Sequence, residues 1–562
     1  MRNIVLGALT AIAGSLAGPA FAVTLNVATY GEEVATFPVG FPGWDEFAMA
    51  DCFEGLVAED VRGNAMPGQA QSWTVSPDGM TYRFTLRPGI LWSDGNAVTA
   101  QDFVTAFRWL FDPSNAVEFA SIQFPIQNAQ AVAKGSMAPD ALGVMAADPQ
   151  TLEIRLDYPT PYFLQTLTHY SAFPVPTEKF KRLGRDWLKP ENIVCNGPFV
   201  IAGHEPGVMR LERSATYYGR EAVRLDGVNY HSYADLQAGL DAFGRGEIDL
   251  FMDVPHAATP WIRAHTGAAL DVEPFLGVYF YALNHDKPPF DDVRVRMALS
   301  MAVDRDAIDP FDLRTPALSS YSWVPAGTAG YGSAPLPRPQ WADWSMDERL
   351  ARARELLAES GHGPGNPLTV EMRYSQAGDD LHQRIAVAMS DMWARIGVRT
   401  RLVPVALDEH FNALRSGDFD VGRVTWLLDV PDPSNVLQLF RSDSEYNFGR
   451  YRSETYDALL DAASAEGDSA ERATILRQAE QTAIDDVAAI PIYWSSIQNL
   501  IAPDVNCVVA NPKNIHRARW ISKGASDAEA CWSESGGLPK DTRRGRIGGP
   551  VRIDGAACPT RP

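Results

Sequence analysis

The stretch PPFDDVRVRMAL, residues 288–299, lies near the middle of the 562-residue chain. Its two prolines mark a break between elements, because proline has no backbone N–H and a fixed φ. Asp291 and Asp292 then supply an acidic helix start, which interacts favourably with the helix dipole. The stretch therefore predicts a helix over its second half, and the chain runs on from it into Ala302–Arg305.

Strands and helices alternate along the rest of the chain. Residues 24–28 are predicted to form an opening strand, and residues 81–86 alternate at period two, as a half-buried strand does. A capping box formed by Ser345 and Glu348 predicts a helix that Gly361 stops. Further predicted elements are a helix with Leu381, Ile385, Ala388, Met392 and Ile396 on one side that ends at Gly397, a helix over residues 456–465, and a buried strand over residues 489–494. The mixture predicts an α/β fold with several lobes.

Length and composition narrow the class of protein. The chain is far too long for one hydrophobic core, so two to four domains are expected. Apolar residues make up 46% and charged residues 21%, as in ordinary globular proteins. The net charge of -21 makes nucleic acids and anionic membrane surfaces poor partners. No fixed-period repeat is present, which argues against a solenoid or propeller.

The first 22 residues have the composition of a secretory signal peptide. Arg2 gives a positive start, residues 4–16 are apolar, and Ala20-Phe21-Ala22 supplies a cleavage site. No cysteine lies near this site, so no lipid anchor is expected, and no later segment is long and apolar enough to span a bilayer. We therefore expect a soluble periplasmic protein that starts at Val23. Its last residues, 532–562, are rich in Gly, Pro and Arg and are expected to form a flexible tail.

The five cysteines are Cys52, Cys195, Cys507, Cys531 and Cys558. Their spacing fits no zinc site, and an oxidising compartment allows disulfides. We expect a Cys507–Cys531 bridge, with Cys531–Cys558 as the alternative. Cys52 and Cys195 lie in apolar runs, and Cys52 is expected to be an unpaired, buried side chain.

Sequence signatures of catalysis are absent. The chain has no G-x-S-x-G elbow, no H-E-x-x-H and no P-loop, and its ten histidines form no cluster. We therefore expect a protein that is not an enzyme and needs no cofactor or metal, and a secreted hydrolase with an unrecognised site is the remote alternative.

Six stretches, in order, carry a family resemblance. They are FEGLV (53–57), LWSDG (91–95) leading into VTAQDFV (98–104), NGPF (196–199), the central stretch 288–299 running on to residue 305, and WLLDVPDPS (426–434). Together they resemble the oligopeptide- and dipeptide-binding receptors of ABC importers, extracellular solute-binding family 5, over residues 24 to 500. Most of these motifs are expected to be structural: Asp94-Gly95 as a tight turn and Asp102 as the cap of the helix that follows.

The resemblance implies the large type of periplasmic receptor (cluster C), an α/β fold of two lobes and an inserted domain that closes around its ligand. The implied parts are lobe I at about 23–53, 177–280 and 498–531, the family-specific insertion at about 54–176, and lobe II at about 281–497.

The resemblance also implies a set of ligand-binding residues. Asp429 matches the aspartate that accepts the α-ammonium of a bound peptide, and Arg423 matches a position that meets the peptide carboxylate. His382 matches a position associated with the carboxylate of longer peptides, and Trp426 would form a pocket wall. Phe119 stands where relatives tend to have a Tyr that faces the ligand backbone, and Leu414 stands where some have a second Arg.

Each of these residues also has a simpler interpretation. From the residues alone, Asp429 is a turn residue, Arg423 a solvated strand residue and His382 an exposed residue at a helix end.

The implied function is to bind short peptides and deliver them, as a monomer, to an ABC-type membrane permease. Other solutes carried by this fold are the alternatives: oligosaccharides, opines, metal chelates or a murein peptide. Peptide length and side-chain preference are left open.

Overall fold

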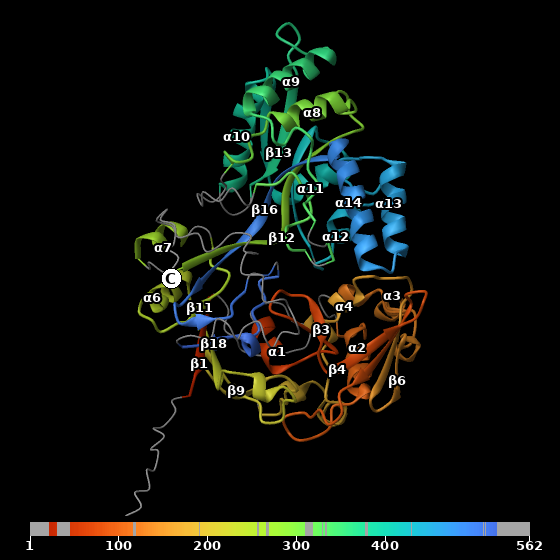
Figure 1. The fold of residues 1–562 in the computed structure, drawn as a ribbon, viewed down its shortest axis with the longest axis vertical. Coiled ribbons are helices and arrows are strands. Elements are labelled where there is room, and N and C mark those ends of the chain that lie inside the picture. The colour runs from red at the N-terminus through yellow and green to blue at the C-terminus, as the bar shows by residue number, and fades with distance from the viewer. Residues whose placement is uncertain are drawn as a thin grey trace, which may run out of the picture.

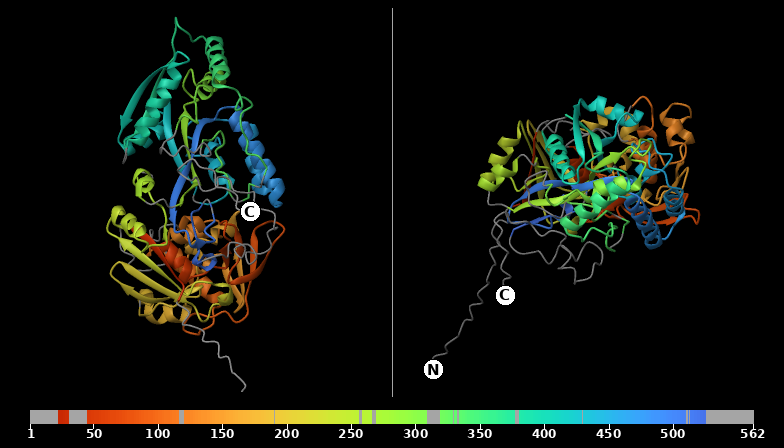
Figure 2. Two further views of the ribbon diagram at one scale, coloured as in Figure 1. Left: turned by 60° about the vertical axis from the view of Figure 1, so that its left-hand side comes forward. Right: turned by 90° about the horizontal axis from the view of Figure 1, so that it is seen from above.

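The computed structural model describes residues 22–30, 45–115, 120–189, 191–255, 258–265, 269–308, 319–328, 330–331, 334–376, 380–428, 430–509, 511 and 513–524. The molecule is elongated and divides into an upper and a lower half, as oriented in Figure 1. Two long strands, β12 (Ala269–Leu283) and β16 (Ala489–Ile501), run side by side from one half into the other. Figure 2 shows the same two-part shape from the side.

A mixed ten-stranded sheet extends through both halves, in the order β14-β13-β15-β12-β16-β11-β1-β10-β9-β8. The antiparallel pairing of β12 with β16 is interrupted between Pro274 and Val278. The other strands of this sheet are β1 (Thr24–Tyr30), β8 (Phe199–Glu205), β9 (Val208–Arg213), β10 (Gly227–Tyr233) and β11 (Leu250–Phe251) in the lower half, and β13 (Thr369–Ser375), β14 (Arg399–Val405) and β15 (Val421–Leu427) in the upper half.

The lower half contains a second sheet. Its four antiparallel strands run in the order β4-β5-β7-β6, and helix α2 (Ala100–Leu110) packs against it. The strands are β4 (Ala70–Val75), β5 (Thr81–Leu86), β6 (Val144–Asp148) and β7 (Thr151–Arg155). Smaller elements of this half are β2 (Val57–Glu59), β3 (Ala65–Pro67), β17 (Val505–Asn506), β18 (Ser522–Lys523), α1 (Asp45–Cys52), α3 (Ala129–Ala133), α4 (Phe163–Thr166), α5 (Thr177–Leu183), α6 (Leu236–Gly244) and α7 (Thr259–His265).

In the upper half, helices cover both faces of the sheet. Alternation along β12 divides its side chains: Tyr279 and Tyr281 join a core with α8, α9 and α10, while Val278 and Phe280 join a core with α11 to α14. The helices are α8 (Val293–Met301), α9 (Met346–Glu359), α10 (Leu381–Ala394), α11 (Leu407–Ser416), α12 (Pro433–Leu437), α13 (Glu454–Ala465) and α14 (Ser469–Asp485).

The predicted local elements are largely confirmed. Asp292 is the N-cap of α8, and its side chain accepts a hydrogen bond from the Arg294 N–H. Ser345 and Glu348 form the expected capping box of α9, and β5 spans the predicted residues 81–86. The predicted apolar side of α10 is rotated: Met389 and Trp393 are fully buried, whereas Ala388 and Met392 are only partly so.

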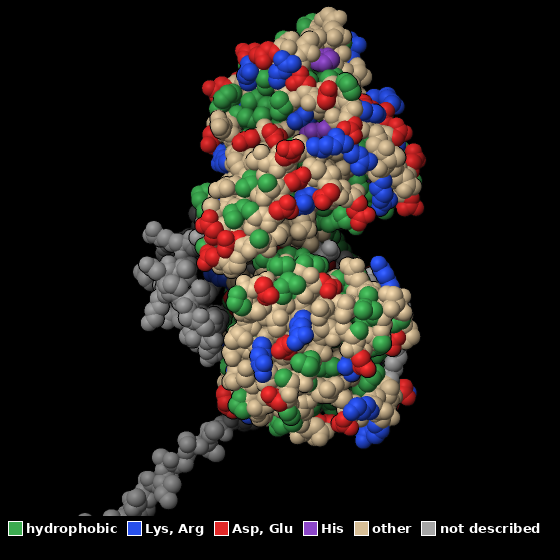
Figure 3. Space-filling view, turned by 90° about the vertical axis from the view of Figure 1, so that its right-hand side faces the viewer, with side chains coloured by type: hydrophobic (Ala, Val, Ile, Leu, Met, Phe, Trp, Pro, Cys, Tyr) green, Lys and Arg blue, Asp and Glu red, His purple; other side chains and the backbone are tan. Residues whose placement is uncertain are grey.

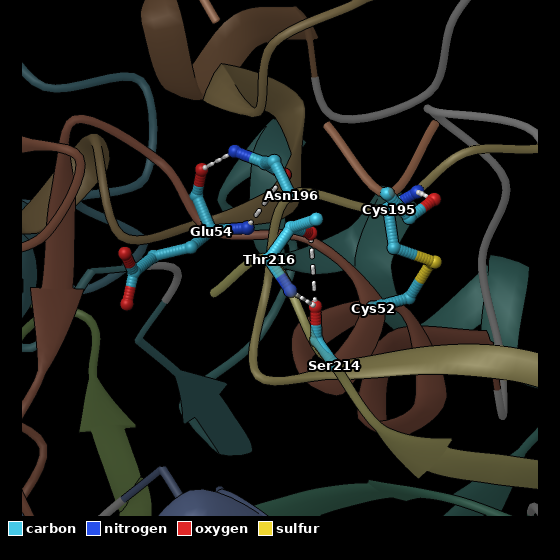
Figure 4. The surroundings of a disulfide bond; sticks show 7 residues. Cys52, Glu54, Cys195, Asn196, Ser214 and Thr216 are labelled. Atoms are coloured by element: carbon cyan, nitrogen blue, oxygen red, sulfur yellow. Dashed lines mark hydrogen bonds between the residues drawn. A yellow bond between two sulfur atoms is a disulfide. The ribbon is translucent and has the colours of Figure 1, made fainter. Parts of the chain in front are cut away.

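The prediction that Cys52 is unpaired is wrong. Cys52, the last residue of α1, forms a disulfide with Cys195, with Cα atoms 5.0 Å apart (Figure 4). Beside it, Glu54 and Asn196 exchange two hydrogen bonds through the Glu54 backbone, and a Cβ on Gly197 would lie 2.8 Å from the Cys52 carbonyl group. Apolar surroundings correctly indicate buried cysteines, but burial alone does not separate a free thiol from a disulfide.

The predicted Cys507–Cys531 bridge stays a prediction. Cys507 is disulfide-bonded. Both candidate partners, Cys531 and Cys558, lie outside the described residues.

Candidate functional site

A ligand is expected to bind in the space between the two halves. Figure 3 shows the surface hollowed at the boundary between the halves. The carboxyl end of β15 is directed to this boundary, because β15 pairs antiparallel with β12 and ends at Leu427, opposite Gly277 in the interrupted part of β12. Side chains near the end of β15 are therefore candidates for contact with a ligand.

Arg423 is a buried cation on β15. Only 5% of the residue is exposed, so the solvated alternative is excluded. Its Nη1 donates to the Thr425 hydroxyl at 3.1 Å and its Nη2 donates to the Ser375 hydroxyl, while Nε is buried with no partner among the described residues. Over the same residues, Arg423 forms no ion pair with a carboxylate, whereas Glu371 and Glu409 pair with Arg373.

Three tyrosines surround Arg423 on the neighbouring strands. Tyr281 lies opposite Arg423 in the sheet, and Tyr279 lies opposite both Thr425 and Tyr493 of β16. The rings of Tyr279 and Tyr493 stack with centroids 4.9 Å apart. This arrangement follows from strand order and period-two alternation, which place the side chains of β15, β12 and β16 in one row.

His382 is brought to the same group from α10. Its ring is half-buried, with Nδ1 3.4 Å from the Tyr279 hydroxyl and centroids 5.7 Å apart. The structure therefore places two of the predicted residues, Arg423 and His382, near the same tyrosine, Tyr279.

Burial shifts the pKa values of Arg423, Tyr279 and His410. Burial lowers the pKa of the Arg423 guanidinium, and the nearby Tyr279, Tyr281 and Tyr493 act in the opposite direction. Burial also raises the pKa of Tyr279 to about 12, so its hydroxyl stays protonated. His410 lies beneath with Nε2 2.8 Å from the Arg423 carbonyl oxygen, and burial lowers the pKa of its imidazole to about 4. At neutral pH the arrangement presents the desolvated positive charge of Arg423 beside neutral tyrosine hydroxyls and the neutral imidazole of His410, which suits a carboxylate.

Trp426 lies apart from this group. It packs against the other core of the upper half, donates from Nε1 to Asn435 at 3.2 Å and meets the Tyr446 ring at 5.1 Å. Residues three apart on a strand face opposite sides, which separates Trp426 from Arg423. Tyr446 is 46% exposed, so the two rings form an aromatic surface at the end of β15.

Two predicted residues, Asp429 and Phe119, lie outside the described residues, and their roles stay predictions. Leu414 is described and is fully buried in the core, where a Cβ on Gly422 would lie 2.4 Å from it. It therefore offers no charge to a ligand.

Sequence reasoning missed the residues that surround Arg423: Ser375, Tyr279, Tyr281, Thr425 and Tyr493. The one available signal was the run of three aromatic residues, Tyr279-Phe280-Tyr281. It gives no strand order, and the strand order is what brings these side chains together.

Metal ligands do not gather anywhere in the described ranges. Among the same residues, no helix has the length and apolar character needed to cross a bilayer.

Comparison with known proteins places the chain in a family. The family described as bacterial extracellular solute-binding proteins, family 5 Middle, matches residues 64–448. The chain is 34% identical to the periplasmic oligopeptide-binding protein OppA of Escherichia coli K12, over 81% of this chain and 83% of the relative. It is 35% identical to the probable deoxycholate-binding periplasmic protein YgiS of the same organism, over 81% and 85%.

Solved structures agree in fold and match the chain to different degrees. The unliganded open form of the murein tripeptide-binding protein MppA matches with a TM-score of 0.84 and 30% identity, over 90% of this chain and 98% of that one. The Haemophilus influenzae OppA complex with the peptide RPPGFSPFR matches with a TM-score of 0.62 and 27% identity, over 90% and 99%. The present structure thus matches the unliganded open form of MppA more closely than it matches the peptide complex. The fold predicted from the sequence is confirmed, and the chain belongs to the bacterial extracellular solute-binding proteins of family 5.

Proposed function

We propose that this chain is the periplasmic substrate-binding protein of a peptide ABC importer. It takes short peptides into the space between its lobes, closes around them and delivers them to the membrane permease. It acts as a monomer without catalysing a reaction, carries a cleaved signal peptide over residues 1–22 and has no lipid anchor. Its parts are lobe I at 23–53, 177–280 and 498–531, the inserted domain at 54–176 and lobe II at 281–497.

Arg423 is the observation that carries the proposal. A guanidinium that is 95% buried costs free energy unless an anion pairs with it, and its described partners are two neutral hydroxyls. The carboxylate of a peptide supplies the missing anion in bidentate geometry. His382, 3.4 Å from the Tyr279 hydroxyl, is the proposed contact for the carboxylate of a longer peptide.

Asp429 is the proposed partner of the ligand's α-ammonium. It comes two residues after the end of β15 and six residues after Arg423 in the sequence, so the two ends of an extended short peptide have opposite charges to meet. An ammonium transferred from water into a closed site needs such a carboxylate.

Calorimetry with tri-alanine tests the carboxylate end. We expect Arg423→Gln to weaken binding roughly 100-fold or more, equivalent to about 3 kcal/mol, because it removes one side of a buried charge pair. Arg401→Gln, which removes an exposed arginine of the edge strand β14, is the matched control and should bind as the unmodified protein does. Equal binding by all three proteins would remove the main support for the proposal.

The amine end is tested by comparing tri-alanine with its N-acetylated form. Acetylation of the peptide and Asp429→Ala in the protein should each lower the affinity roughly 100-fold. The two changes together should lower it by much less than the product of the two factors, because both delete the same contact. Deoxycholate, the ligand in the name of the relative YgiS, has a carboxylate but no amine. If the protein binds deoxycholate and binds acetylated and free tri-alanine equally well, its ligand is a bile acid and not a peptide.

A further inference from the structure

Asp253 is an acidic residue at the edge of the lower half that faces the upper half. Strand β11 pairs antiparallel with β16, with Phe251 opposite Leu500, so it runs toward the boundary between the halves. Asp253 follows it and lies beside Asn499, three residues along β16 from Ser496, the last residue paired with β12 before the interruption. Strand β11 is also parallel to β1, and ligands of open α/β sheets bind outside the carboxyl ends of parallel strands.

The backbone of Asp253 is held in an unusual conformation. Its φ is 55°, in the left-handed region that residues other than glycine rarely adopt. Its N–H donates to the Asn499 side-chain carbonyl oxygen at 3.1 Å, and the Asn499 amide in turn donates to Asn514 Oδ1 at 2.7 Å. Both asparagines are buried, at 0% and 3% exposed. Buried side-chain amides therefore fix this backbone, which is how a folded protein holds a functional side chain in one direction.

The side chain of Asp253 is directed outward into a hollow. Met252 and Val254 on either side of it are each 2% exposed, whereas Asp253 itself is exposed. The surrounding protein nevertheless desolvates its carboxyl group and raises its pKa. A group that is both exposed and desolvated lies in a concave part of the surface, where another molecule can reach it.

Within the described part of the chain, nothing compensates the charge of Asp253. Its carboxylate accepts no hydrogen bond and forms no ion pair there, and no charged group of that part acts on its pKa. Asp249, four residues earlier, is different: it pairs with Lys523 at 2.8 Å and accepts from the Asn26 N–H at 2.8 Å. The carboxylate of Asp253 is thus suited to a cation brought by a ligand, because a cation beside it offsets the desolvation.

We infer that Asp253 is the lower-half contact for a positively charged side chain, lysine or arginine, of the bound peptide. The inference rests on the proposed function and adds a preference to it: Arg423 and Asp429 of the upper half hold the ends of the peptide, and the lower half selects a basic side chain. The strands support this division, because β15 and β11 end at the boundary from opposite halves.

The test compares arginine with citrulline, its uncharged isostere. Tri-alanine peptides carrying Arg or citrulline at each position in turn are titrated calorimetrically into the unmodified protein, Asp253→Asn and Asp241→Asn. We expect the unmodified protein to prefer Arg over citrulline roughly 10-fold or more at one position, as for a hydrogen bond to a charged group. Asp253→Asn should abolish this preference, because it removes the charge and keeps the shape of the side chain.

Asp253→Asn should fold as the unmodified protein does. Asparagine adopts a positive φ more readily than most residues, and the bond to Asn499 uses the backbone N–H, which the substitution keeps. The melting curve of the variant checks this.

Asp241→Asn is the matched control. Asp241 is exposed on α6 of the same half and accepts from Gln237 Nε2 at 2.8 Å. The substitution changes the net charge by the same amount as Asp253→Asn, so it should keep the preference for Arg if the preference comes from a contact with Asp253 and not from the overall charge.

The outcomes separate the two proposals. If the peptides bind but Arg and citrulline are equal at every position, or if Asp253→Asn keeps the preference, the contact is refuted and the proposed function stands. If Asp241→Asn loses the preference as Asp253→Asn does, overall charge explains it and the contact is also refuted. If none of the peptides binds, the proposed function fails and the contact fails with it.

Discussion

Asp51 is a carboxyl group buried at the end of α1. It is 1% exposed and accepts hydrogen bonds from the Tyr230 hydroxyl at 2.7 Å and the Ala518 N–H at 3.0 Å. Burial raises its pKa from 3.8 to about 6, although these hydrogen bonds and the nearby Arg517 act in the opposite direction. The folded protein therefore holds the Asp51 proton more tightly than the unfolded chain does.

This shift predicts a pH dependence of stability. The contribution of a carboxyl with a raised pKa is fully present below the unfolded pKa and is lost as pH rises through the folded value, here between about 4 and 6. We expect the unmodified protein to lose about 3 kcal/mol over this range relative to Asp51→Asn, which cannot ionise. Urea denaturation of both proteins at pH 4, 5, 6 and 7 measures the difference. Parallel stability curves would show that Asp51 does not titrate in this range.

For single residues, the sequence indicates which residue has a role better than it indicates which side chains surround that residue. The resemblance marks Arg423, but from the residue alone a solvated strand position is equally reasonable. Burial decides between them, and burial depends on Tyr281 and Ser375, which lie 142 and 48 positions away along the chain. Likewise, Cys52 and Cys195 are 143 residues apart, a separation that says nothing about contact.

Helix starts are the elements best predicted from sequence, because a cap is a local interaction within four residues. Ser345 and Asp292 are examples. The side on which a helix is buried is harder. Helix α10 has apolar residues over a wide arc, so two neighbouring stripes fit the same sequence, and packing of Met389 and Trp393 against the sheet selects one of them.

Asp102 combines a cap with tertiary contacts. It is the third residue of α2 and accepts from the backbone N–H of Thr99 at 2.9 Å, from that of Thr177 at 2.9 Å and from Trp92 Nε1 at 3.3 Å. Asp102→Ala leaves these donors without an acceptor in a buried place, and we expect a loss of about 2–4 kcal/mol in the free energy of unfolding.

Ser345→Ala is the comparison for Asp102→Ala, because the capping box of α9 is exposed. It should cost only about 1 kcal/mol. Urea denaturation gives both values. Equal losses would mean that the tertiary bonds of Asp102 add nothing to its role as a cap.

For the whole molecule, the family resemblance predicts two lobes and an inserted domain, and the separate four-stranded sheet within residues 70–155 lies inside the span expected for the insertion. The residue pattern alone gives only an α/β fold. The continuous sheet through both halves depends on β12 and β16, whose pairing spans more than 200 residues of sequence, and no local pattern encodes such a contact.

The similarity to an unliganded open form leads us to expect a closing movement. The structure matches an unliganded open form better than a peptide complex, and β12 and β16 both run across the boundary with interrupted pairing at Pro274–Val278. We expect peptide binding to bend the molecule at this interruption and lower its radius of gyration, which small-angle X-ray scattering with and without tri-alanine measures. The Cys52–Cys195 bridge lies within the lower half, so reduction should leave the change intact. An unchanged radius at saturating peptide would exclude closure.

Gly277 gives the movement a specific test, because it lies inside the interruption. A Cβ at this position would come within 2.9 Å of the Ser495 Cβ and 2.7 Å of Leu427, at the crossing of β12, β16 and β15. Gly277→Ala should therefore displace the strands where they bend, so that the peptide-induced fall in radius becomes smaller and the affinity decreases. Gly363→Ala is the control, since a Cβ there meets nothing within 4 Å. If both variants close as the unmodified protein does, the bend lies elsewhere along β12 and β16.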